Sequence, residues 1–239
     1  MILLGGGLLA ALLVAYLRLR SQLDTQLYQP RLAWLRAGLY AVCCALLAHL
    51  VGTFQALTQT PLLAGYEQAG VAWLLATALC FVVIVVAYAV IWPRGTFTDG
   101  RARHPLSQLL FGLAWGLAQG LLFLSFWLLL SQTGWATLWL ALLAYLCIGG
   151  YNGLWHHFVW DIHVSPPHNY SEWNARKVLL CHTPNLLVSL SHLAVFGNLW
   201  VFLALQTLAL VLSAWAMRFP AYGDAYHPLP GQERSLKSA

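Results

Sequence analysis

Seven apolar runs dominate the sequence, and each is long enough to form a helix that crosses a membrane. A helix needs roughly 20 apolar residues to cross the hydrocarbon core of a bilayer, which is about 30 Å thick. The runs cover residues 2–17, 33–53, 71–92, 109–131, 135–157, 178–196 and 199–217. Only 8% of all residues are charged, compared with about 25% in soluble domains. We therefore predict an all-α, polytopic transmembrane helix bundle of about seven helices.

The ends of the chain fit one membrane domain with a short tail. The first run has no basic segment before it and no small-residue cleavage site after it, so we expect residues 2–17 to remain as a helix rather than to be removed as a signal peptide. Residues 218–239 are polar and rich in proline, which predicts an irregular extension. We expect a single transmembrane domain over residues 1–217 and a cytoplasmic tail over residues 218–239.

Basic residues indicate which helix ends face the cytoplasm, because short cytoplasmic loops retain Lys and Arg. All twelve basic residues lie in or beside alternate connections or in the tail, on one side of a seven-helix arrangement. They are Arg18, Arg20, Arg31, Arg36, Arg94, Arg101, Arg103, Arg176, Lys177, Arg218, Arg234 and Lys237. We therefore predict that the N-terminus lies outside and that the C-terminus lies in the cytoplasm.

The composition also bears on partners and location. Because the basic residues are scattered between apolar runs rather than gathered on one face, we expect no nucleic-acid binding. Membrane lipid is the expected surrounding, with an apolar small-molecule substrate and other membrane proteins as candidate partners. The expected location is the bacterial inner, or cytoplasmic, membrane.

Polar residues concentrate on the fifth and sixth predicted helices, and six of the nine histidines lie between positions 156 and 192. One face of the fifth helix carries Tyr145, Asn152, His156 and His163 at helical spacing. One face of the sixth carries His182, Asn185, Ser189 and His192. Polar groups are costly inside a bilayer and often mark a functional site. Since the two helices are consecutive and antiparallel, we expect the stripes to face each other.

The first interpretation of this cluster is a metal site near the cytoplasmic interface. Neutral imidazoles and carboxylates are the usual ligands of zinc and non-haem iron. The candidate ligands are His156, His157, Asp161, His163, His168 and His182. Asp161 could bind the metal or orient His157, and Asp161 and Glu172 are the candidate catalytic carboxylates. This interpretation predicts a metal-dependent hydrolase or oxidoreductase that acts on a lipid or another apolar substrate.

Two other interpretations stay open. His49 and His192 are expected at similar depths on the second and sixth helices, where they could hold a haem or another pigment as axial ligands. Alternatively, the stripes form a hydrogen-bond network between helices, because polar groups buried in lipid must find partners. Either arrangement fits a non-catalytic subunit of a larger membrane complex.

Several functions are excluded by missing signatures. The sequence contains no HExxH motif, no glycine-rich phosphate loop and no nucleophile elbow. The histidine spacing lacks the HxxxH and HxxHH boxes of membrane desaturases and hydroxylases. No lysine lies in the last run, which excludes a retinal Schiff base.

Two further features predict how helices pack. The fourth helix carries small residues every four positions, Gly112, Gly116 and Gly120. Such spacing favours close approach of a neighbouring helix, with substrate access as the alternative, and Gln119 lies beside that face. Pro184 removes one backbone hydrogen bond inside the sixth helix, so the carbonyl of Leu180 loses its partner near His182.

Overall fold

The computed structural model describes residues 30–96, 102–158 and 175–218. These ranges hold six helices long and apolar enough to cross a membrane, Ala33–Val51, Val71–Arg94, Pro105–Ser131, Thr137–Leu154, Ala175–Phe196 and Leu199–Met217. The six helices coincide with the second to seventh predicted runs, and the described ranges contain no strand. This agrees with the predicted all-α membrane bundle. The first predicted run, residues 2–17, lies outside the described residues.

The described elements follow one another in a simple order. They are α2 (Pro30–Val51), α3 (Thr53–Gln59), α4 (Tyr66–Ala69), α5 (Val71–Val85), η1 (Val86–Ile91), η2 (Trp92–Gly95), α6 (Pro105–Ser131), α7 (Thr137–Phe158), α8 (Ala175–Lys177), η5 (Val178–His182), α9 (Thr183–Phe196) and α10 (Leu199–Met217). Two of them, η1 and η5, are π-helical, and η2 is a 3₁₀ turn. Each continues a neighbouring α-helix, so that α5–η1–η2 and α8–η5–α9 form single membrane-length rods.

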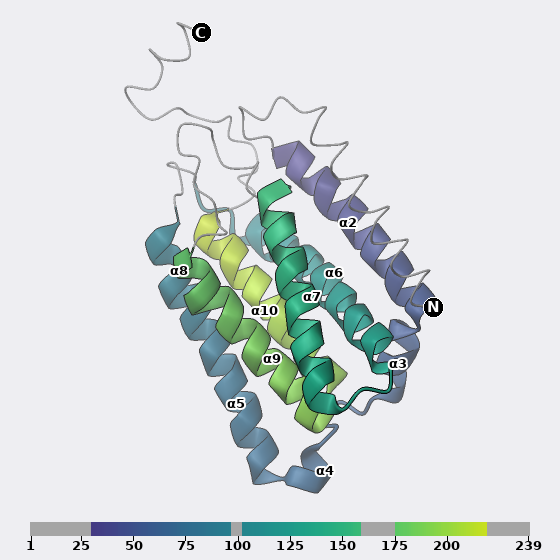
Figure 1. Cartoon of the computed structure of the whole chain (residues 1–239). Coiled ribbons are helices and arrows are strands. Elements are labelled where there is room, and N and C mark those ends of the chain that lie inside the picture. Colours follow the sequence, from purple (N-terminus) through teal and green to yellow (C-terminus); the bar gives the residue numbers. More distant parts are fainter. Residues whose placement is uncertain (1–29, 97–101, 159–174, 219–239) are drawn as a thin grey trace, which may run out of the picture.

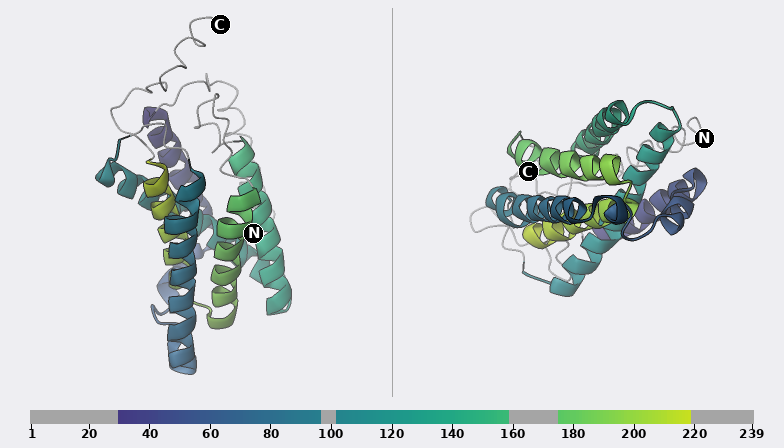
Figure 2. Two further views of the ribbon diagram at one scale, coloured as in Figure 1. Left: turned by 90° about the vertical axis from the view of Figure 1, so that its left-hand side faces the viewer. Right: turned by 90° about the horizontal axis from the view of Figure 1, so that it is seen from below.

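Helix α10 lies at the centre of the bundle, where it contacts α5, α6 and α9. Helix α2 packs against α6 on one side, and α7 packs against both α6 and α9. Figures 1 and 2 show these helices running along one common direction, with α2 and α5 at opposite edges. The core between them is made of large apolar and aromatic side chains.

Three glycines bring α6 against α10. A Cβ at Gly112 would lie 2.6 Å from the Cα of Val211, and a Cβ at Gly116 would lie 2.7 Å from the Cα of Thr207. Carbon atoms do not approach a backbone this closely, so a larger residue would push the two helices apart. Gly120 continues the seam one turn further along α6. The packing interpretation of the glycine spacing is therefore confirmed.

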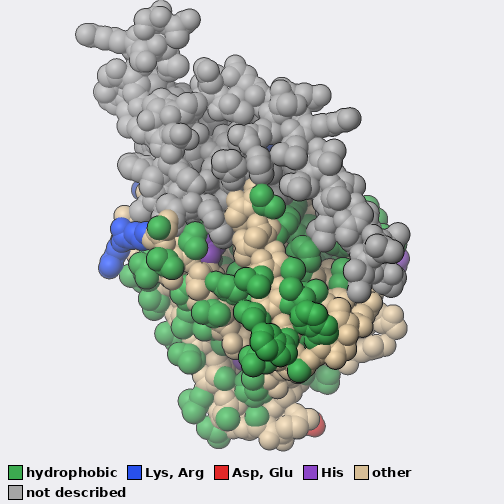
Figure 3. Space-filling view, viewed as in Figure 1, with side chains coloured by type: hydrophobic (Ala, Val, Ile, Leu, Met, Phe, Trp, Pro, Cys, Tyr) green, Lys and Arg blue, Asp and Glu red, His purple; other side chains and the backbone are tan. Residues whose placement is uncertain are grey.

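The exterior of the bundle is apolar along much of its length. Large side chains that point outward include Val42 and Leu46 on α2 and Leu75, Leu79 and Val82 on α5. Figure 3 shows hydrophobic side chains spread over one face of the molecule. A soluble protein rarely exposes so much contiguous apolar surface, whereas a membrane protein presents it to lipid.

Charged side chains divide between the two ends of the bundle. Among the described side chains the only carboxylate is Glu67, in α4. The basic side chains lie near helix termini at the opposite end, at Arg36, Arg94, Arg103, Arg176, Lys177 and Arg218. Figure 3 shows Lys and Arg side chains mainly at the left edge of the view, below the grey atoms, and an acidic side chain at the lower end. This is the charge separation expected across a membrane.

Candidate functional site

Two π-helical segments contact each other at the centre of the site. Segment η1 carries Tyr88, and η5 ends at His182. Pro184 follows η5 and has no N–H, so it cannot donate to the carbonyl of Leu180 and the α-helical pattern is broken there. The disruption predicted from Pro184 thus takes the form of a π-helical turn. Such turns are frequent at functional sites.

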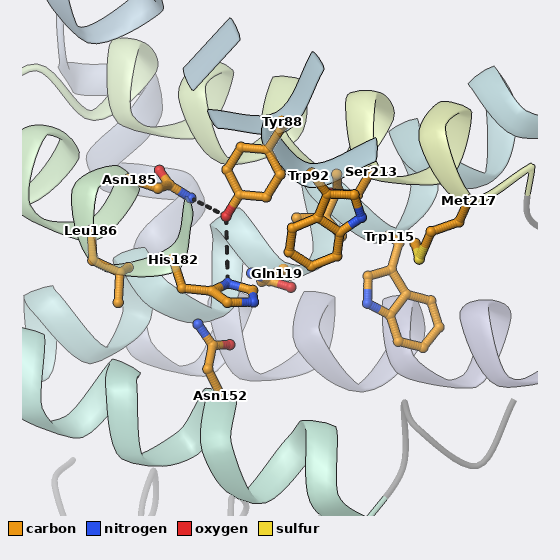
Figure 4. A pocket seen from close by; sticks show the side chains of 11 residues that line it. Tyr88, Trp92, Trp115, Gln119, Asn152, His182, Asn185, Leu186, Ser213 and Met217 are labelled. Carbon is orange, nitrogen blue, oxygen red and sulfur yellow. Dashed lines mark hydrogen bonds between the residues drawn. The ribbon is translucent and has the colours of Figure 1, made fainter. Parts of the chain in front are cut away.

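A small cavity lies beside these segments, in the half of the bundle that carries the basic side chains. Its lining consists of Tyr88, Trp92, Trp115, Gln119, Asn152, His182, Asn185, Leu186, Leu210, Ser213 and Met217. The cavity volume is about 30 Å³. Since one water needs roughly 10–15 Å³ of such space, the cavity has room for about two water-sized groups. Figure 4 shows how side chains from several helices converge on it.

Asn185 is the centre of a hydrogen-bond network behind His182. Its Nδ2 donates to the Tyr88 hydroxyl and to Gln206 Oε1, each at 3.3 Å. Its Oδ1 accepts from Gln206 Nε2 and from Ser189 Oγ, each at 3.1 Å. These four bonds use both donors and both lone pairs of the amide. Asn185 therefore has no capacity left for a ligand, although it lines the cavity.

The Tyr88 hydroxyl connects this network to His182, because its oxygen lies 3.4 Å from His182 Nδ1 (Figure 4). Two further amides reach the same cavity from other helices, Asn152 from α7 and Gln119 from α6. Asn152 is 5% exposed, and its amide points toward the His182 ring in Figure 4. The side chains of His182, Asn152 and Gln119 thus bring hydrogen-bonding groups from three helices to the cavity.

Trp92 forms an ordered wall of the cavity. Its ring meets the His182 ring edge to face, with centroids 5.2 Å apart, and stacks on Tyr88 at 5.3 Å. Lys177 is 1% exposed, and its Nζ lies 4.1 Å from the centroid of the Trp92 ring. The same Nζ donates to Thr96 Oγ1 at 2.7 Å. A buried cation over an indole ring is favourable, so Lys177 stabilises the position of Trp92.

The polar stripe predicted on the sixth helix is buried along its whole length, at His182, Asn185, Ser189 and His192. Its partners come mainly from α5, η1 and α10 rather than from the fifth predicted helix, α7. Tyr145 on α7 lies 3.4 Å from Thr183 through their hydroxyl oxygens, and Asn152 joins His182 at the cavity. The two predicted stripes therefore meet around the cavity, and the outer half of the α9 stripe contacts other helices.

The haem interpretation concerned His49 and His192. His192 is 3% exposed, and its Nε2 lies 2.9 Å from Thr77 Oγ1. Its ring contacts Trp73 and Phe196, with centroids 6.0 Å and 4.8 Å away. His49 is exposed on α2. The two histidines thus lie in different surroundings, and haem binding stays a prediction.

The metal interpretation rests largely on positions that lie outside the described residues, namely Asp161, His163, His168 and Glu172. His156 and His157 belong to the last turn of α7, but their side chains are outside the described part of the structure. Among the described side chains, no group of three or more His, Cys, Asp or Glu comes together as a metal site requires. His182 is the one predicted ligand whose surroundings the structure gives.

Several site residues were not identified from the sequence. Tyr88 and Trp92 come from the third predicted run and Trp115 from the fourth, where aromatic residues in an apolar run give no signal of their own. Gln206 offered a signal, since an amide inside a membrane span needs a partner. Gln119 was noted beside the glycine face and does line the cavity. No protein-family model, curated protein or solved structure matches this chain.

Proposed function

We propose that this chain is an integral protein of the bacterial inner membrane that binds the polar end of a lipid or another apolar molecule in the cavity beside His182. It crosses the membrane seven times, with residues 2–17 as the first span, the N-terminus outside and residues 218–239 as a cytoplasmic tail. The charge separation between Glu67 and the basic end supports this orientation. The cavity then lies in the cytoplasmic half of the bilayer.

One observation carries the binding proposal. His182, Asn152 and Gln119 come from three different membrane-spanning rods and border one cavity. Polar side chains are costly inside a bilayer and are found there when they meet each other or a ligand. Asn185 shows the first situation, because its four hydrogen bonds saturate its amide. At the cavity, the edge of the His182 ring that faces away from Tyr88 and the amides of Asn152 and Gln119 converge on one space, which is the arrangement of a small pocket with a few convergent polar groups.

The size of the cavity limits what it binds. With a volume of about 30 Å³, it accommodates a terminal polar group rather than a whole lipid. The indoles of Trp92 and Trp115 and the side chains of Leu186 and Met217 supply apolar walls. A carboxyl, ester, aldehyde or amine group would enter, and its hydrocarbon chain would stay in the lipid around the bundle.

Photolabelling tests this binding. The full chain in lipid nanodiscs is exposed to two probes, a long-chain fatty acid and a long-chain amine, each with a diazirine next to its polar end. We expect at least one probe to label α7 or α9 beside the cavity. Leu186→Trp should abolish the labelling, because Leu186 is 3% exposed and lines the cavity.

Leu187→Trp is the matched control, since Leu187 neighbours Leu186 but is 50% exposed on the outside of α9. We expect it to label as the unsubstituted chain does. Equal labelling of both tryptophan variants, or no labelling of the cavity by either probe, would contradict the binding proposal.

Cysteine accessibility tests the orientation. Gln132 follows α6 at the end of the bundle near Glu67, and Ala102 precedes α6 at the basic end; both are exposed. In intact cells, a membrane-impermeant maleimide should label Gln132→Cys, whereas Ala102→Cys should react only after the inner membrane is opened. The native cysteines of the described residues are buried or half-buried, so the unsubstituted chain serves as the background control. The reverse pattern would reject the proposed orientation.

A metal-dependent enzyme is the second candidate, and it is favoured by the position of His156 one helical turn after Asn152 on α7. A zinc or iron ion held by histidines that include His182 would activate water or oxygen for attack on the bound end group. Mass spectrometry of metals and a visible spectrum on one purified sample test it. Near-stoichiometric iron or zinc that is lost in His156→Ala/His182→Ala supports the enzyme, and a Soret band would favour haem instead. A colourless, metal-free, folded protein counts against both.

A non-catalytic subunit of a larger membrane complex is the competing class, and the saturated Asn185–Gln206 network between α9 and α10 favours it. In that case His182→Ala should lower thermal stability before any activity or binding is affected. In an enzyme or binding protein, the same variant should keep its unfolding temperature and lose labelling or turnover.

A further inference from the structure

We propose that Gln206, Asn185 and Tyr88 are positioning residues that hold His182 with its proton on Nε2, so that the cavity offers an N–H donor to a ligand oxygen. The inference rests on the proposed function and names the ligand's chemical class. The end group that enters the cavity is a carbonyl or carboxylate oxygen, which accepts a hydrogen bond.

The amide pair of Asn185 and Gln206 determines which groups donate and which accept in this network. Asn185 and Gln206 exchange two hydrogen bonds, with 3.3 Å from Asn185 Nδ2 to Gln206 Oε1 and 3.1 Å from Gln206 Nε2 to Asn185 Oδ1. Ser189 donates to the same Oδ1. All three residues are at most 4% exposed. With both lone pairs of Oδ1 occupied by donors, the second hydrogen on Asn185 Nδ2 points to the Tyr88 hydroxyl oxygen.

The Tyr88 hydroxyl connects Asn185 to His182, and the bond from Asn185 determines where the hydroxyl hydrogen points. Its oxygen accepts from Asn185 Nδ2, so its own hydrogen is the one directed at His182 Nδ1, 3.4 Å away. Tyr88 is 2% exposed. If Nδ1 carried a hydrogen, the Tyr88 hydrogen would face a second donor and would have no acceptor among the described residues. Buried hydroxyl groups are rarely left in that state. Nδ1 is therefore the acceptor, and a neutral His182 carries its proton on Nε2.

The tautomer of His182 determines which ligands its ring can bind. Nε2 lies on the side of the ring away from Tyr88, and His182 lines the cavity (Figure 4). An Nε2–H group donates a hydrogen bond, whereas binding a metal through Nε2 would need a lone pair there. The amides of Asn152 and Gln119 border the same cavity and supply further N–H donors. Because the amides carry oxygens as well as N–H groups, the Nε2–H of His182 is the group that favours an oxygen acceptor over an ammonium group.

Nitrogen NMR of the ring tests the tautomer directly. The full chain is labelled with ¹⁵N-histidine, placed in nanodiscs, and its His182 resonances are identified from their loss in His182→Gln. We expect the carbon-bound ring protons of His182 to report a protonated Nε2 and an unprotonated Nδ1. A protonated Nδ1, or two tautomers in exchange, would overturn the proposal. This spectrum is recorded without any ligand, so its result does not depend on whether the cavity binds one.

Tyr88→Phe tests the positioning role. The variant keeps the ring that stacks on Trp92 and removes the hydroxyl that contacts Nδ1, so we expect the two His182 tautomers to interconvert. Tyr145→Phe is the matched control, because its hydroxyl bonds to Thr183 instead, and it should leave the His182 spectrum unchanged. A single Nε2–H tautomer in both variants would reject a positioning role for Tyr88. The unsubstituted chain decides the tautomer even where a variant does not fold.

The two photolabelling probes then test the ligand class. We expect the fatty acid to label the cavity about tenfold more than the amine, as a difference of one hydrogen bond to a charged group allows. The preference should disappear in His182→Phe. Equal labelling, or preference for the amine, would reject an oxygen acceptor while leaving the proposed binding function intact. Labelling by neither probe would contradict the binding function itself and leave the NMR result standing.

Discussion

His182 and His192 lie ten residues apart on the same buried face of one helical rod, yet their surroundings differ. His182 borders a cavity together with amides from α6 and α7. His192 is packed against the rings of Trp73 and Phe196 and bonds to Thr77. Burial of a histidine in a membrane helix therefore does not by itself indicate a site. The signal at His182 is that polar groups from several helices meet where space remains.

The difference between the two regions follows from helix geometry. Around His192, α5 and α9 are regular α-helices, and the His192 ring lies against Trp73 and Phe196. Around His182, both rods become π-helical, over η1 and η5. A π-helical turn contains an extra residue, so side chains are displaced from the regular α-helical positions. The cavity thus occurs where the two irregular segments meet. A hollow at the outer end is lined by residues within 61–69 and by Val195 and Phe196, and His192 is not part of its lining.

The largest effect is expected where one seam supports both regions, between α6 and α10. Gly116→Ala places a Cβ 2.7 Å from the Cα of Thr207, and such overpacking typically costs about 1–3 kcal/mol. Gly149→Ala is the matched control, because nothing lies within 4 Å of its added Cβ and alanine favours the helix by roughly 0.5–1 kcal/mol. The unfolding temperature in detergent should fall for Gly116→Ala and hold or rise for Gly149→Ala. Equal temperatures would reject the close seam.

The next effect separates the two asparagines at the cavity. Asn185→Leu removes four hydrogen bonds and leaves Tyr88, Ser189 and Gln206 short of partners, so we expect a loss of about 1–2 kcal/mol. Asn152 makes no side-chain hydrogen bond to another described residue, so Asn152→Leu should change stability by less than about 1 kcal/mol. Photolabelling should be affected more by Asn152→Leu than by Asn185→Leu. We expect Asn152→Leu to remain folded but to lose labelling by the probe. A strong loss of stability in Asn152→Leu would mean that its amide supports the fold rather than the ligand.

The sequence predicted the fold well because its strongest signals act over whole helices. Run length does not depend on which helices touch, and six predicted runs match described helices. The glycine spacing on α6 predicted a seam, but it did not identify α10 as the partner. The stripe from His182 to His192 predicted burial correctly, whereas its main partners, Tyr88, Thr77 and Gln206, come from other runs. Spacing within one helix cannot determine which neighbours face it, and that limited prediction of the site.

The smallest expected effect lies in the outer region. His192→Phe removes the bond to Thr77 and keeps a ring against Trp73 and Phe196. Hydrogen bonds between membrane helices contribute about 0.6 kcal/mol on average, so the unfolding temperature should change little. Thr77→Val should cost a similar amount, and the double variant should cost no more than either alone, because both remove the same bond.

His182→Phe is the counterpart of His192→Phe in the inner region, and comparing the two tests the distinction directly. We expect His182→Phe to lose fatty-acid labelling, because the N–H donor disappears from the cavity, whereas His192→Phe should label as the unsubstituted chain does. If both variants lost labelling equally, the two histidines would act as one site along α9. If neither lost it, the ligand would be held by the amides of Asn152 and Gln119 without His182. Loss of labelling in His182→Phe alone is the result expected if the site is confined to the π-helical region and His182 itself binds the ligand.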